Sequence, residues 1–131
     1  MIGLDTNVVV RFLVADDPRQ AERARALVER AVVAGEPLFI PDIVWCETVW
    51  VLDSAYGLPR REICAALRSL LAARGIVVRS FDRLGAALNA YEHRRGDFAD
   101  YLIREEARAE GCDAVATFDR ALLEEDGFRT P

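Results

Sequence analysis

The hydrophobic and polar positions of this chain follow two periods that alternate along the sequence. Short, continuous apolar runs lie at residues 2–4, 38–40, 76–78 and 114–116, and each is predicted to form a β-strand. Between them, apolar residues recur three and four positions apart, which is the spacing of a helix with one buried face. We predict helices at residues 7–13, 18–34, 42–56, 59–74, 82–93, 98–109 and 120–125.

Local signals mark the ends of several of these helices. Asp17 and Pro18 are typical of an N-cap and a first helical residue, and Gly35 is expected to end the same helix. Short strands that alternate with amphipathic helices are typical of an α/β fold with a mainly parallel sheet. A length of 131 residues, 52% of them hydrophobic, predicts one domain over residues 1–131 with a sizeable core.

The residue types that are missing exclude several chemistries. The chain has no lysine, which excludes a P-loop and Schiff-base catalysis. His93 is the single histidine, so neither RNA cleavage by a histidine acid/base pair nor a zinc site of several histidines is available. No serine lies in a nucleophile elbow. Among hydrolytic chemistries, a carboxylate site for a hard metal ion remains.

The cysteines and the apolar runs indicate where the protein works. Three widely spaced cysteines form no metal-ligand pattern, and buried, reduced thiols are the simplest account of them. No apolar stretch approaches the roughly 18 residues of a membrane span, and the first residues do not resemble a signal peptide. We therefore expect a cytoplasmic protein that does not insert into a membrane.

Four acidic residues lie where a packed α/β domain does not normally place a carboxylate. Asp5 and Asp119 each follow an apolar run, Asp100 begins an apolar helical segment, and Glu47 has apolar residues at all four neighbouring helical positions. We therefore expect Glu47 to face inward. Because buried, unpaired carboxylates are costly, several of them together imply a cation. Carboxylate oxygens suit Mg²⁺ or Mn²⁺, and these ions serve phosphoryl chemistry.

The predicted topology brings these acids towards one edge. In an open parallel sheet, ligands bind beyond the carboxyl ends of the strands, where Asp5 and Asp119 lie, and the helix N-terminus that carries Asp100 points to the same edge. Each residue also has an ordinary explanation: Asp5 and Asp119 as N-caps, and Asp100 as a first-turn acid beside the helix dipole. Asp97 is better explained as an N-cap, although it is a possible additional acid of the site.

Two polar residues beside these acids are candidates for orienting them. Asn7 and Thr117 could hydrogen-bond to the carboxylates, or could serve in ordinary turns. The net charge of −5 argues by itself against a nucleic-acid ligand, but the four candidate acids account for most of it. Arginines suit phosphate because of their planar fork of donors, unless they are simply solvated surface residues. The candidates are Arg11, Arg79, Arg83, Arg94 and Arg95.

The ordered motifs resemble a known family. Residues 4–13 (LDTNVVVRFL), followed by residues 16–18 (DDP), are similar to the opening of PIN-domain proteins, above all of VapC-like ribonuclease toxins of type II toxin–antitoxin systems. Residues 40–52, with Glu47, resemble the second motif of the family. Residues 97–103 resemble the third, in which Asp100 fits the acidic position better than Asp97. Residues 116–119 (ATFD), with Asp119, resemble the fourth, so the resemblance spans nearly the whole chain.

The resemblance implies both a fold and an activity. The fold is a three-layer α/β/α domain with a mainly parallel central sheet of four or five strands. The activity is that of an endoribonuclease with Mg²⁺ or Mn²⁺ at the acidic cluster. The resemblance also implies a homodimer, which could join a larger toxin–antitoxin assembly, and inhibition by a small VapB-like antitoxin. The helix that carries Trp45, Val49, Trp50 and Leu52 is apolar over more than one face, as a helix in an interface would be.

The sequence thus predicts a nuclease in which Asp5, Glu47, Asp100 and Asp119 are catalytic, and Asp5, Asp100 and Asp119 bind the metal. Metal-activated water would hydrolyse the RNA phosphodiester. Two alternatives stay open. The same site could process or repair structured RNA or DNA, or a PIN-like module could bind RNA or protein without cutting. A receiver-type phosphoacceptor domain is disfavoured because such a domain needs a lysine near its acidic pocket.

Overall fold

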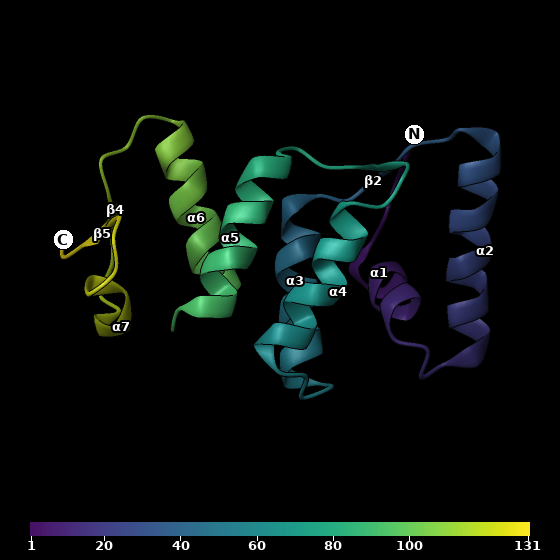
Figure 1. Ribbon diagram of the computed structural model, residues 1–131, viewed down its shortest axis with the longest axis horizontal. Coiled ribbons are helices and arrows are strands. Elements are labelled where there is room, and N and C mark those ends of the chain that lie inside the picture. Colours follow the sequence, from purple (N-terminus) through teal and green to yellow (C-terminus); the bar gives the residue numbers. More distant parts are fainter. The chain divides into compact units, whose positions relative to one another are not determined.

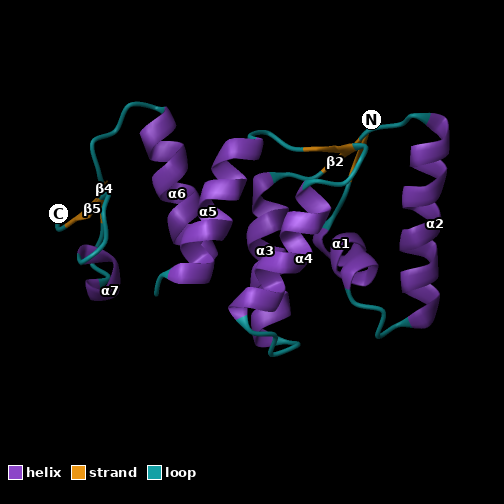
Figure 2. Cartoon of the chain, in the orientation of Figure 1, coloured by secondary structure: helices purple, strands orange, loops and turns teal.

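The computed structural model describes all residues from Met1 to Pro131. The chain forms two compact units, Met1–Arg79 and Ser80–Pro131, each of which is described by itself. Helices make up most of both units and the strands are short (Figure 2). None of the helices combines the length and the apolar character that crossing a membrane requires.

The first unit is a three-stranded parallel sheet with four helices (Figure 1). Its strand order is β1-β2-β3, with Ile2 opposite Leu38 and Leu38 opposite Ile76. Parallel neighbours need a crossover connection, and the helices between the strands provide it. The elements are β1 (Ile2–Gly3), α1 (Thr6–Leu13), α2 (Pro18–Ala34), β2 (Leu38–Phe39), α3 (Asp42–Ser54), α4 (Arg60–Leu71) and β3 (Ile76–Val77).

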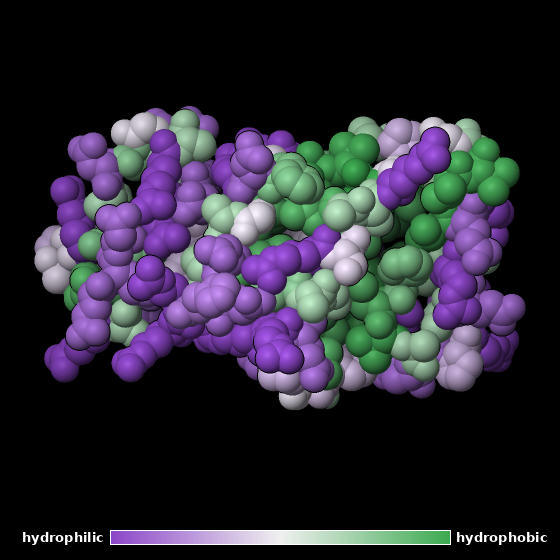
Figure 3. All heavy atoms as spheres, viewed as in Figure 1, coloured by the Kyte–Doolittle hydropathy of each residue, from purple (hydrophilic) through white to green (hydrophobic).

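The core of the first unit lies where α3 packs against α1 and α4. Trp45, Leu52, Ile63 and Leu67 are almost completely buried there. Burying each such side chain contributes roughly 1.5–3 kcal/mol, so these helices are held by their apolar faces. On the face drawn in Figure 3, hydrophobic residues also gather at the surface around α1 and β2.

The second unit is built on a pair of antiparallel helices and a two-stranded parallel sheet. The helices α5 (Phe81–His93) and α6 (Phe98–Ala109) lie side by side (Figure 1). They bury Leu84, Leu88, Phe98 and Tyr101. The remaining elements are β4 (Val115–Ala116), α7 (Arg120–Leu123) and β5 (Phe128–Arg129), and β4 pairs with β5.

The sequence predicted most of these elements and their ends. Asp17 caps α2 by accepting a hydrogen bond from the Gln20 N–H, and Gly35 ends the helix at a φ of 66°, a left-handed conformation that glycine adopts readily. The predicted α/β class with parallel strand pairing is confirmed. The short strand β5 was not predicted, because two residues after a turn are too few to show a hydrophobic pattern. The prediction of a single domain stays a prediction.

Candidate functional site

Asp5 and Asp119 occupy equivalent places in the two units. Each follows a strand and caps the next helix, α1 and α7 respectively. An oxygen of Asp5 accepts a hydrogen bond from the Thr6 N–H at 2.8 Å, and an oxygen of Asp119 accepts one from the Ala121 N–H at 2.9 Å. Both side chains are exposed. The N-cap role is therefore real at both positions, and it holds one oxygen of each carboxylate while the side chain stays accessible.

The two candidate orienting residues behave differently. The Thr117 hydroxyl accepts a hydrogen bond from the Asp119 N–H at 3.0 Å and so supports the turn that presents this carboxylate. Asn7 is exposed in the first turn of α1 and forms no hydrogen bond with Asp5. The neighbouring Thr6 hydroxyl is buried without a hydrogen-bond partner, next to the cap.

Asp100 and Asp97 form the turn that begins α6. Asp97 is the N-cap, as predicted, and its backbone N–H donates to a carboxylate oxygen of Asp100 at 3.0 Å. Asp100 is half-buried, and loss of hydration raises its pKa. The negative charges of Asp97, Asp119 and Glu125 raise the pKa further, while the hydrogen bond from Asp97 opposes the change. A cation bound beside Asp100 would relieve this repulsion.

Glu125 is the member of this acidic group that sequence reasoning missed. Its carboxylate accepts a hydrogen bond from the buried Tyr101 hydroxyl, with O···O distances of 2.8 and 2.9 Å. The same hydroxyl accepts a hydrogen bond from the Gly96 N–H at 2.7 Å. A buried tyrosine needs a polar partner, but the sequence does not reveal which residue supplies it.

Glu47 lies on the exposed side of α3, so our expectation that it faces inward was wrong. Its apolar neighbours Ile43 and Trp50 are themselves 58% and 47% exposed. The opposite side of α3, with Trp45 and Thr48, enters the core instead. An apolar neighbourhood in sequence therefore did not mean burial, because this helix is apolar on two sides.

The cysteines offer no nucleophile beside Glu47. Cys46 is buried, and loss of hydration raises the pKa of its thiol to about 11, with Asp42 and Glu47 adding to the shift. Such a thiol stays protonated and unreactive at neutral pH. Cys64 is also buried, whereas Cys112 is exposed, contrary to the expectation of buried thiols.

The candidate acids are divided between the two units. Asp5 and Glu47 belong to Met1–Arg79, where the helices that carry them, α1 and α3, pack together. Asp100 and Asp119 belong to Ser80–Pro131, within electrostatic reach of each other. Nowhere in the structure do three acidic, histidine or cysteine side chains converge as metal ligands. The metal site thus stays a prediction for the four acids as a set.

Comparison with known proteins places the chain in a family. The model of the PIN domain family matches residues 2–126. A protein of Aquifex aeolicus (strain VF5) named VapC ribonuclease is 29% identical over 127 residues, which cover 97% of this chain and 93% of that protein. Together with the parallel strands and the strand-end positions of Asp5 and Asp119, the nearly complete family match leads to one conclusion: this chain belongs to the PIN domain family.

Proposed function

We propose that the protein is a metal-dependent endoribonuclease and the toxin of a VapBC-type toxin–antitoxin pair. The observation that carries this proposal is its similarity, over 97% of the chain, to a protein named VapC ribonuclease. All four acidic motifs occur in this chain in the order that the family resemblance requires. We propose Asp5, Asp100 and Asp119 as metal ligands and Glu47 as the fourth catalytic acid.

The three aspartates share a geometry that suits cation binding. In each of them a backbone N–H holds one carboxylate oxygen, at 2.8 Å in Asp5, 3.0 Å in Asp100 and 2.9 Å in Asp119. A carboxylate fixed in this way loses less conformational freedom when it binds an ion. Helix N-termini also favour negative charge. Asp97 and Glu125 add further negative charge beside Asp100.

When bound, Mg²⁺ or Mn²⁺ would neutralise charge on the phosphate and lower the pKa of a bound water. Asp5, Asp100 and Asp119 would hold the ion, and its positive charge would offset the repulsion that raises the pKa of Asp100. Water rather than the ribose 2′-hydroxyl is the proposed nucleophile. The products should therefore carry a 5′-phosphate and a 3′-hydroxyl, and ends with a 2′,3′-cyclic phosphate would exclude this scheme.

The proposed partners are an RNA substrate, a second copy of the chain and a small VapB-like antitoxin. Exposed apolar side chains support a protein partner: Ile43 and Trp50 on α3 are 58% and 47% exposed. Large apolar groups at a surface favour association because contact removes them from water. The proposed antitoxin would inhibit by covering the acidic residues with its C-terminal segment.

Cleavage of a mixed panel of tRNA, rRNA and mRNA tests the nuclease. The purified protein is incubated with Mg²⁺, with Mn²⁺ and with EDTA, beside the variants Asp5→Asn and Asp53→Asn. Asparagine caps a helix as well as aspartate does, so Asp5→Asn should keep the fold and lose cleavage. Asp53 is exposed and lies outside the proposed site, so Asp53→Asn makes the same charge change and should cut normally. Equal activity of both variants would contradict the assignment of Asp5.

Expression in a bacterial host tests the toxin role separately. A toxin should arrest growth, and a co-expressed antitoxin from the neighbouring gene should relieve the arrest. Cleavage without growth arrest would favour a PIN-domain nuclease of RNA processing instead. Metal binding without cleavage of any RNA would favour a module that binds RNA or protein.

A further inference from the structure

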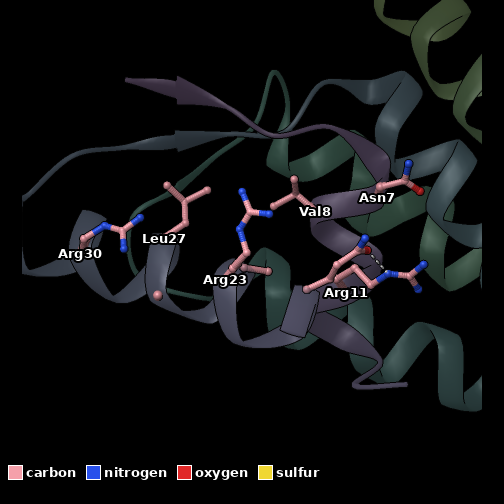
Figure 4. A pocket seen from close by; sticks show the side chains of 9 residues that line it. Asn7, Val8, Arg11, Arg23, Leu27 and Arg30 are labelled. Atoms are coloured by element: carbon pink, nitrogen blue, oxygen red, sulfur yellow. Dashed lines mark hydrogen bonds between the residues drawn. The ribbon is translucent and has the colours of Figure 1, made fainter. Parts of the chain in front are cut away.

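A pocket of about 480 Å³ lies between α1 and α2, within the first unit (Figure 4). Arg11, Arg23 and Arg30 line it, together with a floor of apolar side chains that includes Val8 and Leu27. The Arg23 side chain extends across the pocket between Leu27 and Val8. No acidic residue lines the pocket, although the chain as a whole carries a net charge of −5. The pocket is therefore positively charged, although the protein as a whole is acidic.

The charges of α2 are sorted between two faces. Arg23 and Arg30 are seven residues apart, so they lie on the same face of the helix, and both line the pocket. Glu22 and Glu29 directly precede them in sequence, and adjacent helical residues do not face each other. Neither glutamate lines the pocket. Arg23 and Arg30 therefore have no acidic partner on their own helix.

Arg11 differs from the other two arginines because its donors are engaged. Its Nε donates to Gln20 at 2.7 Å, and its Nη1 donates to Asp16 and to the Tyr56 hydroxyl, each at 3.0 Å. The bond to Gln20 ties α1 to the first turn of α2. Arg11 lies at one end of the pocket (Figure 4). The side chains of Arg23 and Arg30 form no hydrogen bond or ion pair. Their guanidinium groups are available to a ligand.

We infer that this pocket binds the sugar-phosphate backbone of single-stranded RNA beside the cleavage site, an inference that rests on the proposed function. Guanidinium forks match phosphate oxygens, and an apolar floor suits the ribose and the faces of unstacked bases. The pocket also lies close to a catalytic residue. Asn7 lines it from the first turn of α1, and Asp5 caps that helix two residues earlier. RNA held at the Asn7 end of the pocket would therefore lie near Asp5.

Binding of RNA without cleavage tests the pocket. The probe is a fluorescein-labelled single-stranded RNA of mixed sequence, and its anisotropy is followed over a series of KCl concentrations in the Asp5→Asn protein. Added to this background, Arg23→Gln with Arg30→Gln is compared with Arg25→Gln with Arg61→Gln. Both pairs remove two positive charges from exposed positions, but Arg25 and Arg61 do not line the pocket. Substitutions at such exposed positions should leave the fold intact, which circular dichroism checks.

The pocket variant should bind the RNA about tenfold or more weakly, since it loses two charge-assisted phosphate contacts. The slope of log K against log salt should fall by about 1.4, which is roughly 0.7 for each lost contact with a single strand. The control pair should keep the affinity and the slope. In the cleaving protein, the pocket pair should raise KM and leave kcat nearly unchanged.

Three results would overturn the inference. Equal weakening by both pairs would mean a general charge effect, and no weakening by either would mean that RNA does not enter the pocket. Undiminished RNA binding by a pocket variant that no longer binds poly-glutamate would assign the pocket to an acidic protein segment. These outcomes are compatible with a wild type that cuts RNA, so the proposed function would survive them. A wild type that neither binds nor cuts RNA would overturn both.

Discussion

Replacing Asp100 by asparagine is expected to stabilise the metal-free protein and to abolish cleavage. In the folded chain Asp100 is half-buried and close to the charges of Asp97, Asp119 and Glu125, and both effects raise its pKa. Asparagine removes the charge but keeps an oxygen that can accept the hydrogen bond from the Asp97 N–H. The substitution therefore relieves repulsion without breaking the turn that begins α6.

The expected gain is small but measurable. Asp100 is partly exposed, so solvent screens the repulsion and the effect has the size of a surface charge interaction. We expect the free energy of unfolding to rise by less than about 1 kcal/mol, which raises Tm by up to roughly 4 °C in a chain of this size. The gain should shrink in high salt, because salt screens the repulsion.

The dependence of the gain on pH follows from the raised pKa. Folded Asp100 binds its proton more tightly than unfolded Asp100, so the stability of the wild type falls as pH rises from the ordinary pKa of 3.8 to the raised pKa. Above this pH range Asp100 is ionised in the folded protein, and its repulsion lowers the stability of the wild type by the full amount. The advantage of Asp100→Asn should thus be complete at pH 7 and vanish as pH approaches 3.8.

Urea unfolding in EDTA, at pH 7 and at pH 4, measures the effect. Asp82→Asn is the matched control, because Asp82 is an exposed aspartate in the first turn of the neighbouring helix α5. Removing its charge should cost a few tenths of a kcal/mol through the helix dipole. If Asp100→Asn destabilised the protein as Asp82→Asn does, Asp100 would be an ordinary first-turn acid and the reasoning would be refuted.

Three further substitutions test other parts of the structure. Gly96→Ala should cost about 1–3 kcal/mol, since the new Cβ would lie 2.6 Å from Leu122 Cδ2 in the core. Thr48→Val should add about 1 kcal/mol of stability, because the buried Thr48 hydroxyl has no hydrogen-bond partner. Tyr56→Phe should destabilise the protein above pH 3.8 and matter less in acid, because the Tyr56 hydrogen bond is the main cause of the lowered pKa of Asp16.

Thermal and urea unfolding decide all three cases. No loss of stability in Gly96→Ala would mean that the loop before α6 moves freely. A destabilised Thr48→Val would mean that its hydroxyl finds a partner in solution. For Tyr56→Phe the sign follows from the lowered pKa of Asp16. The ionised Asp16 carboxylate stabilises the fold at pH values above its pKa in the unfolded chain. This contribution is lost as pH falls through its lower pKa in the folded chain. A pH-independent effect would contradict this.

Local chemistry explains why much of the fold could be predicted. Asp17 and Gly35 bound α2 through contacts with their own neighbours in sequence, and such contacts need no tertiary partner. The same holds for Asp5, Asp97 and Asp119, whose capping positions follow from the strand or loop before them and the helix after them. The α/β class followed from the alternation of two hydrophobic periods.

Tertiary packing decided which side of a helix is buried where the hydrophobic pattern of the sequence allowed more than one side. α3 is apolar on two sides, so the sequence could not tell that Trp45 enters the core while Glu47, with Trp50, stays exposed. Which side is buried depends on where α1 and α4 pack, and those contacts join residues that are distant in sequence. The same reason explains why the prediction that Glu47 faces inward was wrong.

The sequence by itself determined the family, the order of the acidic motifs and the local turns that present Asp5, Asp100 and Asp119. Only the tertiary structure joined Glu125 to Tyr101, 24 residues away, and set Arg23 and Arg30 into a pocket with Arg11. Caps and periods depend on neighbours within one or two turns, which a sequence displays directly. Charge clusters and pockets depend on the packing of distant segments, which residue spacing does not encode.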